Sequence, residues 1–133
     1  MLRLIRIIKP FAGYILVATA VFILTMSSIP SIPTLKIKTG DSTIRLDYLI
    51  HFCEYGFLAF ISFLTFTDME YRIVFRRSVL VLVCLVLFAY TDEFHQKFIP
   101  GRTYNIIDFA SNAAGVAGGW LFSVVVAGVV RRK

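Results

Sequence analysis

The stretch TDEFHQKFIPGR, residues 91–102, concentrates side chains that can carry out acid–base chemistry or hold a charged ligand. It contains two adjacent carboxylates, Asp92 and Glu93, followed by Gln96 and Arg102. Two carboxylates in different surroundings can divide the roles of general acid and general base. An arginine guanidinium can bind a carboxylate or a phosphate through parallel hydrogen bonds. The stretch lies between two strongly apolar segments, where so many ionisable groups are rare and usually functional.

Polar residues recur at helical spacing in two other apolar segments. Successive residues of an α-helix are 100° apart around its axis, so residues three or four positions apart share a face. One such face carries Asp47, His51, Glu54 and Tyr55, and a second carries Asp108, Ser111, Asn112, Gly115 and Gly119. We expect both faces to point into the protein and away from lipid.

The composition indicates a membrane protein. Of the 133 residues, 58% are apolar and 17% are charged, whereas soluble domains average about 45–50% and about 25%. Four apolar segments stand out, at about 11–26, 48–66, 78–91 and 106–130. A spanning helix needs roughly 20 apolar residues, and an open strand would leave backbone groups unpaired in lipid. The sequence therefore predicts an all-α, polytopic membrane protein: one domain over residues 1–133, a bundle of four transmembrane helices.

The basic residues predict the orientation of this bundle. Nine of the fourteen lie in three groups: before the first segment, between the second and third, and after the fourth. By the positive-inside rule, both termini are then cytoplasmic and residues 27–46 and 92–105 are outside. In the short outer loop, LKIK and TIRL alternate around TGD, which predicts a small hairpin. A cleaved signal peptide at the N-terminus is an alternative that leaves the other three helices unchanged.

This topology brings polar residues from three helices to the outer leaflet. Residues 78–90 rise only about 20 Å, which is short of a hydrocarbon core of about 30 Å. Either Arg76 and Arg77 snorkel from within the membrane, or Asp92 and Glu93 lie below the outer interface. A charged residue near mid-membrane costs about 2.5–3.5 kcal/mol, and it persists where it faces a polar partner or a wet cavity. We therefore predict a polar pocket that opens outward.

Carboxylates outnumber fixed cations in this expected pocket, so a proton, a metal ion or a cationic ligand group should balance them. We assign candidate catalytic roles to Asp92, Glu93, Asp108 and His51, and candidate ligand-binding roles to Asp47, Tyr55, Gln96, Arg102 and Asn112. For Arg102 the alternative is a structural clamp on Asp92, Glu93 or Asp108. We assign no metal ligands, because a single His–Glu pair at i, i+3 is weak evidence, and the cofactor is unknown.

The small residues and the cysteines lead to two predictions about packing. Gly115 and Gly119 form a GxxxG spacing that permits close helix approach, within the monomer in preference to a dimer. Cys53 and Cys84 lie inside apolar segments, and we interpret them as buried thiols with no disulfide framework or zinc spacing.

Four short motifs follow one another along nearly the whole chain. They are SS.P (Ser27, Ser28, Pro30), D...HF..Y (Asp47, His51, Phe52, Tyr55), DE..Q.F.PGR (Asp92, Glu93, Gln96, Phe98, Pro100, Gly101, Arg102) and D...N..G...G (Asp108, Asn112, Gly115, Gly119). In this order they resemble the VanZ-like family of membrane proteins. Tyr48 departs from the pattern, since family members often carry Lys there. The resemblance implies a link to low-level resistance to the glycopeptide antibiotic teicoplanin, and it does not imply a reaction.

We therefore expect a multi-pass plasma-membrane protein whose outward-facing pocket binds or acts on an envelope component. The expected partner is a membrane lipid or a lipid-linked cell-wall precursor. The alternatives are a non-catalytic structural or assembly partner and a proton- or ion-coupled carrier. The motifs GxSxG and HExxH and a Gly-rich phosphate loop do not occur, so whether the protein is an enzyme stays open. The basic residues flank apolar segments, which argues against nucleic acid; the oligomeric state is unknown.

Overall fold

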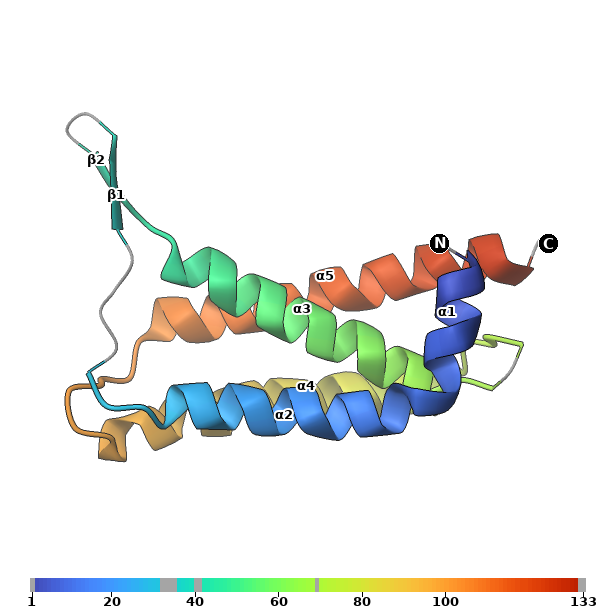
Figure 1. Cartoon of the computed structure of the whole chain (residues 1–133), viewed down its shortest axis with the longest axis horizontal. Helices are drawn as coiled ribbons and strands as arrows, with labels where there is room; N and C mark the ends of the chain where they lie inside the picture. The colour runs from blue at the N-terminus through green and yellow to red at the C-terminus, as the bar shows by residue number, and fades with distance from the viewer. Residues whose placement is uncertain (1, 32–35, 40–41, 69, 132–133) are drawn as a thin grey trace.

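Four long helices form the protein (Figure 1). The computed structural model describes residues 2–31, 36–39, 42–68 and 70–131. The long helices are α2 (Ala12–Ser27), α3 (Asp47–Phe66), α4 (Phe75–His95) and α5 (Ile106–Arg131). The shorter elements are α1 (Leu2–Ile8), the 3-10 turns η1 (Lys9–Phe11) and η2 (Gln96–Phe98), and the strands β1 (Lys36–Thr39) and β2 (Ser42–Arg45).

The long helices run alternately up and down in two layers, with α3 and α5 in one layer and α2 and α4 in the other (Figure 1). Both chain termini lie at one end of the bundle, called the termini end below. The antiparallel pair β1–β2, in which Lys36 is opposite Arg45, lies at the other end, called the hairpin end. Four helical stretches are long and apolar enough to cross a membrane: Leu4–Ser27, Asp47–Phe66, Phe75–Phe98 and Ile106–Arg131. The predicted helical bundle of a multi-pass membrane protein is confirmed.

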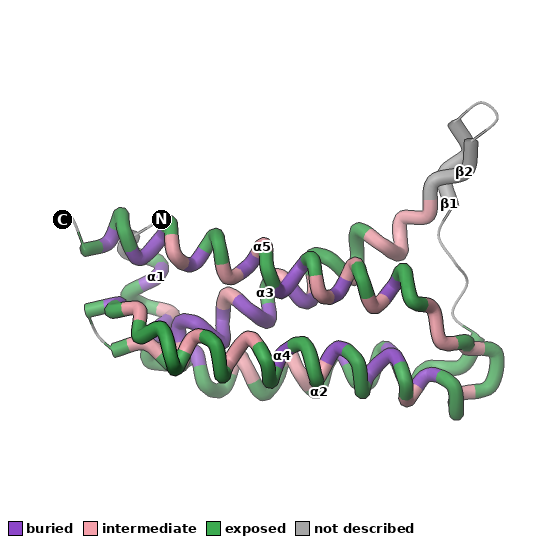
Figure 2. The backbone as a smooth tube through the Cα atoms, turned by 180° about the vertical axis from the view of Figure 1, so that it is seen from behind, coloured by how far each residue is buried: buried purple, intermediate pink, exposed green. Residues whose placement is uncertain are grey.

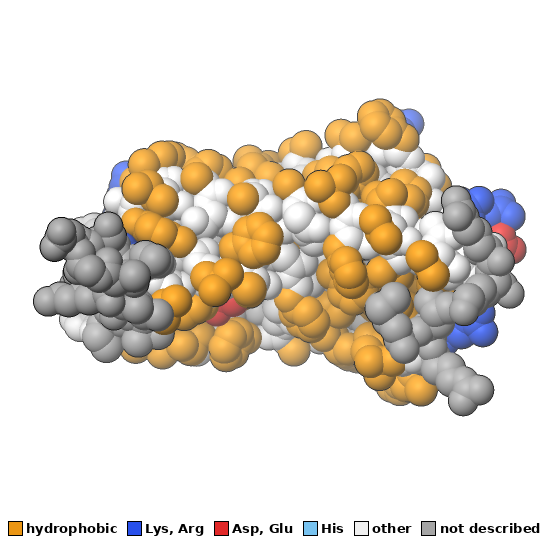
Figure 3. Space-filling view, turned by 90° about the horizontal axis from the view of Figure 1, so that it is seen from above, with side chains coloured by type: hydrophobic (Ala, Val, Ile, Leu, Met, Phe, Trp, Pro, Cys, Tyr) orange, Lys and Arg blue, Asp and Glu red, His pale blue; other side chains and the backbone are white. Residues whose placement is uncertain are grey.

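Many large apolar side chains are exposed on the outside of the bundle, and Figure 3 shows one face rich in them. In each candidate span, only 17–39% of the most apolar 18-residue window is buried inside the protein. Large side chains such as Tyr14 and Phe75 are about four-fifths exposed, which lipid and not water would accommodate. Cys53 and Cys84 belong to this exposed surface, so the expectation of buried thiols was wrong. Buried residues instead line the helix faces that meet at the centre of the bundle (Figure 2).

The most extensive helix–helix contact joins α3 and α5 and depends on glycine. A Cβ atom at Gly115 would collide with the Phe52 carbonyl oxygen, and one at Gly119 would collide with that of Gly56. A Cβ at Gly56 would in turn lie 3.3 Å from the Gly115 carbonyl oxygen. The GxxxG spacing therefore packs two helices of one chain together, as the sequence predicts.

Cationic side chains bind the carbonyl groups at the termini end of α3. Lys9 Nζ donates to the carbonyl oxygens of Leu64 and Thr67, both at 2.9 Å. Arg77 donates to the Phe66 carbonyl oxygen at 2.8 Å. The last carbonyl groups of a helix have no partner within the helix and carry a partial negative charge. Lys9 and Arg77 thus satisfy the end of α3 and tie it to the starts of α2 and α4.

Helix α4 is longer than the apolar run in its sequence. Its 21 residues span about 31 Å at 1.5 Å per residue, which is enough to cross a hydrocarbon core. Arg76 and Arg77 occupy its first turn, while Asp92 and Glu93 lie in its last turns and are almost fully buried. The two carboxylates are therefore inside the bundle and are not part of a solvated loop.

The glycine contact predicts a large difference between two similar substitutions. Gly119→Ala should destabilise the protein by about 1–3 kcal/mol, because the added methyl group overpacks the α3–α5 contact. Gly128→Ala is the matched control, since a Cβ there meets nothing within 4 Å and alanine favours the helix. Unfolding in mixed detergent micelles measures both, and equal stability of the two variants would contradict this account of the contact.

Candidate functional site

Asp92 is the first of two carboxylates held inside the hairpin end of the bundle. It is 1% exposed, and its Oδ2 accepts a hydrogen bond of 2.8 Å from the hydroxyl of Tyr55 on α3. Tyr55 is itself fully buried. Asp92 Oδ1 is buried and has no hydrogen-bond partner in the described part of the chain. Asp92 therefore joins α4 to α3 through Oδ2, and its Oδ1 can accept a further hydrogen bond.

Glu93 is fully buried, and both of its oxygens are engaged. Oε2 accepts from Gln96 Nε2 at 3.3 Å, and Oε1 accepts from the backbone N–H of Asn105 at 2.9 Å. The Asn105 side chain accepts from the backbone N–H of Ile107 at 3.0 Å, so Asn105 also caps the start of α5. Glu93 thus fixes the α4–α5 connection. The sequence analysis missed Asn105, although an Asn just before an apolar helix is a recognisable cap.

Helix α5 contributes Asp108 and Asn112, one turn apart and both buried. Asp108 Oδ1 and both polar atoms of the Asn112 side chain have no hydrogen-bond partner among the residues described. Native structures pair nearly all buried polar groups, because an unpaired one costs about 1–3 kcal/mol. These three atoms can therefore form hydrogen bonds with another molecule.

The polar face of α3 lies beside these groups. Glu54 interacts electrostatically with His51 and with Asp92. His51 is half-buried, and its Nδ1 has no hydrogen-bond partner within the described ranges. The carboxylates of α4 and α5 are also neighbours, since Glu93 interacts electrostatically with Asp108.

Arg45 was missed by the sequence analysis and lies at the start of this face. It forms an ion pair of 3.1 Å with Asp47 and also interacts electrostatically with Asp108. It also donates a hydrogen bond of 3.3 Å to the hydroxyl of Tyr48, and so places a cation beside that residue. The sequence indicates only a charged residue at the end of the hairpin, and the pairing depends on the fold.

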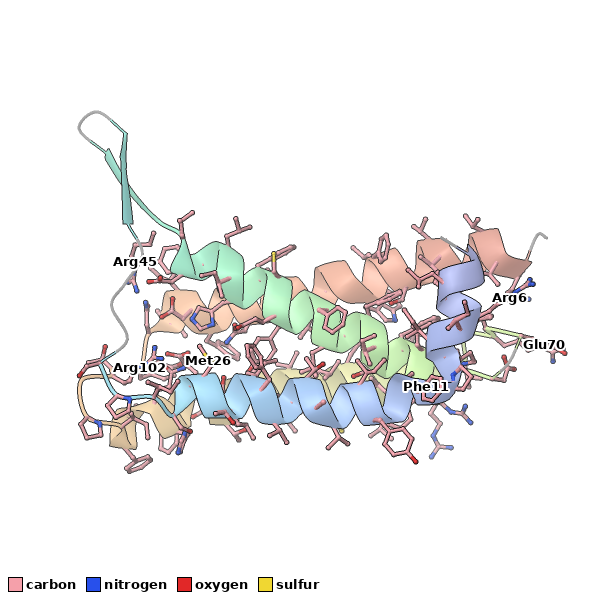
Figure 4. The ribbon with its side chains drawn as sticks, viewed as in Figure 1. Arg6, Phe11, Met26, Arg45, Glu70 and Arg102 are labelled. Atoms are coloured by element: carbon pink, nitrogen blue, oxygen red, sulfur yellow. The ribbon has the colours of Figure 1, made fainter. Side chains whose placement is uncertain are left out.

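Arg102 interacts electrostatically with Glu93 and is also tied to the end of α2. Its Nε and one terminal nitrogen donate to the carbonyl oxygens of Ile29 and Met26, at 3.2 and 3.1 Å (Figure 4). In the described part of the chain it forms no ion pair with a carboxylate. Gly101 precedes it with φ +76°, and a Cβ there would collide with Ser31. The PGR turn therefore clamps the α4–α5 connection onto the end of α2.

The structure thus gathers six of the nine predicted site residues into one buried cluster and places the other three around it. We call the six, Tyr55, Asp92, Glu93, Gln96, Asp108 and Asn112, the polar cluster. Asp47 and His51 lie nearer the start of α3, and Arg102, in the α4–α5 connection, contacts the end of α2. No group of three or more His, Cys, Asp and Glu residues suited to a metal ion occurs in the ranges that the structure describes. The cluster contains three carboxylates that accept hydrogen bonds and can exchange protons, two side-chain amides and one tyrosine hydroxyl.

The fold defines a class: multi-pass membrane proteins built from four apolar helices. The family model VanZ/LLP1 matches residues 11–127, which is most of the chain. The protein belongs to the VanZ-like family. Searches of curated proteins and of solved structures found no match for this chain.

Removing the Tyr55 hydroxyl tests the link between α3 and α4. Tyr55→Phe should lower the free energy of unfolding by about 1–3 kcal/mol, because it leaves a buried oxygen of Asp92 without its donor. Tyr14→Phe is the control, since Tyr14 is 80% exposed on the lipid-facing surface. Unfolding monitored in detergent by near-UV circular dichroism distinguishes the two, and a Tyr55→Phe protein as stable as the control would refute the link.

Proposed function

We propose that the polar cluster binds the head group of an envelope component, a lipid or a lipid-linked cell-wall precursor, in the outer leaflet of the plasma membrane. The observation that carries this proposal is the set of buried atoms without partners on Asp92, Asp108 and Asn112. These atoms lie on the facing sides of two helices at one end of the bundle. A ligand that forms hydrogen bonds with these atoms would offset the cost of burying them.

The chemistry of these atoms defines the kind of head group. Carboxylate oxygens accept hydrogen bonds from hydroxyl and ammonium groups, and the Asn112 amide both donates and accepts. A head group rich in hydroxyl or amino groups, such as a sugar or an amino-acid unit, provides these partners. The acyl chains of the same molecule would lie against the apolar outer surface of the helices.

Charge distribution supports an outward orientation of the hairpin end. The three groups of basic residues flank the spans at the termini end, which the positive-inside rule assigns to the cytoplasm. The polar cluster then faces the outer leaflet, where cell-wall precursors are used.

The hydrogen bonds also divide the roles of the carboxylates. Glu93 is occupied by Gln96 and Asn105, so we infer a positioning role for it. Asp92 and Asp108 each keep an oxygen for a ligand. A reaction at this site would use these two as the acid and base pair, because each has a buried carboxylate oxygen without a hydrogen-bond partner among the described residues.

Glycopeptide tolerance of cells tests the proposal. Cells that express the wild type should tolerate more teicoplanin than cells without it, and Asp92→Asn or Asp108→Asn should abolish the gain. Each amide keeps the shape of the side chain and removes its charge. Thr91→Ala is the control on α4, because Thr91 is exposed and donates only to the Phe88 carbonyl oxygen of its own helix. Membrane level and monodispersity in detergent establish that each variant folds.

A folded Asp92→Asn protein with full tolerance would sink the proposal. Mass spectrometry of amphiphiles that copurify with the wild type gives a second readout. Retention of an unchanged amphiphile supports binding, and its conversion supports catalysis. A proton flux in vesicles that needs Asp92, with no retained amphiphile, would favour a carrier and contradict the head-group site.

A further inference from the structure

A hollow of about 530 Å³ lies at the termini end, opposite to the polar cluster. Residues from three separate parts of the chain line it: Arg6 of α1, Glu70, Tyr71 and Arg72 of the α3–α4 connection, and Val130 and Arg131 of α5. Basic side chains gather at this end of the surface, together with an acidic one (Figure 3). Arg6 and Glu70 are both labelled there in Figure 4.

The floor of the hollow consists of well-packed residues. Tyr71 is 4% exposed and Val130 is 7% exposed, so the floor is apolar and buried. The Lys9 ammonium lies 4.9 Å from the centre of the Tyr71 ring, within range of a cation–π interaction. Tyr71 also adopts φ +55°, a left-handed conformation that is unfavourable for a bulky residue and persists only where its surroundings impose it.

Hydrogen bonds from its own connection impose this conformation. Asp68 Oδ1 accepts from the backbone N–H of Arg72 at 2.8 Å and from that of Glu70 at 3.0 Å. These bonds hold the pKa of Asp68 below its ordinary value. The Tyr71 N–H donates to the Asp68 carbonyl oxygen at 3.1 Å. The turn thereby places the Glu70 and Arg72 side chains together at the rim.

The charges of the lining favour an anion. Three arginines face one carboxylate, Glu70, which already pairs with Arg72. Guanidinium groups match the oxygens of a phosphate through paired hydrogen bonds. Arg6 and Arg131 come from different helices and form no ion pair among the described residues, so both can bind such a group. We propose that this hollow binds the phosphate of an anionic phospholipid in the leaflet at the termini end.

The position of the hollow favours a lipid over a soluble phosphate. Each lining segment is the end of a membrane-spanning helix or the connection between two, so the arginines lie at the level of lipid phosphates. The buried apolar floor suits the less polar glycerol region beneath a phosphate. The inference concerns the opposite end from the proposed head-group site and does not depend on it.

Lipid titration of the purified full chain tests the proposal. The chain, in nanodiscs of phosphatidylcholine, is titrated with phosphatidylglycerol, and bound lipid is counted by native mass spectrometry after release. Phosphatidylglycerol should be retained in preference to phosphatidylcholine. Arg6→Gln and Arg131→Gln should each weaken this preference roughly fivefold. One arginine near an anionic lipid surface contributes about 1 kcal/mol of binding free energy, which corresponds to about that factor in affinity. Arg76→Gln is the matched control: this exposed arginine lies at the same end and lines a different groove.

Three outcomes would overturn the proposal. The first is equal retention of phosphatidylcholine and phosphatidylglycerol by the wild type. The second is an equal loss of preference in Arg76→Gln and in the two lining variants, which would show a general effect of basic charge. The third is displacement of the lipid by glycerol 1-phosphate at equal concentration, which would assign the hollow to a soluble phosphate.

Discussion

The burial of Asp92 and Glu93 in a bundle surrounded by lipid is the constraint on which the rest of the structure depends. Water cannot reach these oxygens freely, and protein donors serve three of the four. Tyr55 supplies one from α3, and Asn105 supplies one from the start of α5. The need to satisfy two adjacent carboxylates therefore fixes how α3, α4 and α5 meet at the hairpin end.

Small residues make this meeting possible. Gly56 directly follows Tyr55, and Gly115 comes three positions after Asn112, so polar and small residues share the facing sides of α3 and α5. Close backbone approach shortens the reach that each polar side chain needs. A bulkier α3–α5 contact would separate Asn112 from the α3 face as well as weaken the packing. Stability and site geometry are thus coupled in this contact.

Local patterns in the sequence predict most of the fold and part of the site. Apolar length predicts the four spans, and helical spacing predicts the inward faces with Tyr55 and Asn112. Spacing cannot predict contacts between distant residues, such as those of Arg102 with the end of α2. Apolar character also fails to separate the bundle interior from the lipid-facing surface, and this is why Cys53 and Cys84 were misplaced. The functions assigned to the site residues stay predictions.

Lys9 has a consequence for the order in which the chain assembles. Its ammonium belongs to the basic group that precedes the first span, yet in the folded protein Lys9 is 8% exposed and binds Leu64 and Thr67. Those partners follow it by 55 and 58 positions. Synthesis at about 5–20 residues per second delays them by roughly 3–12 s. During this interval Lys9 cannot form these two hydrogen bonds, so they can tie the N-terminal helices to α3 only after the end of α3 has been synthesised.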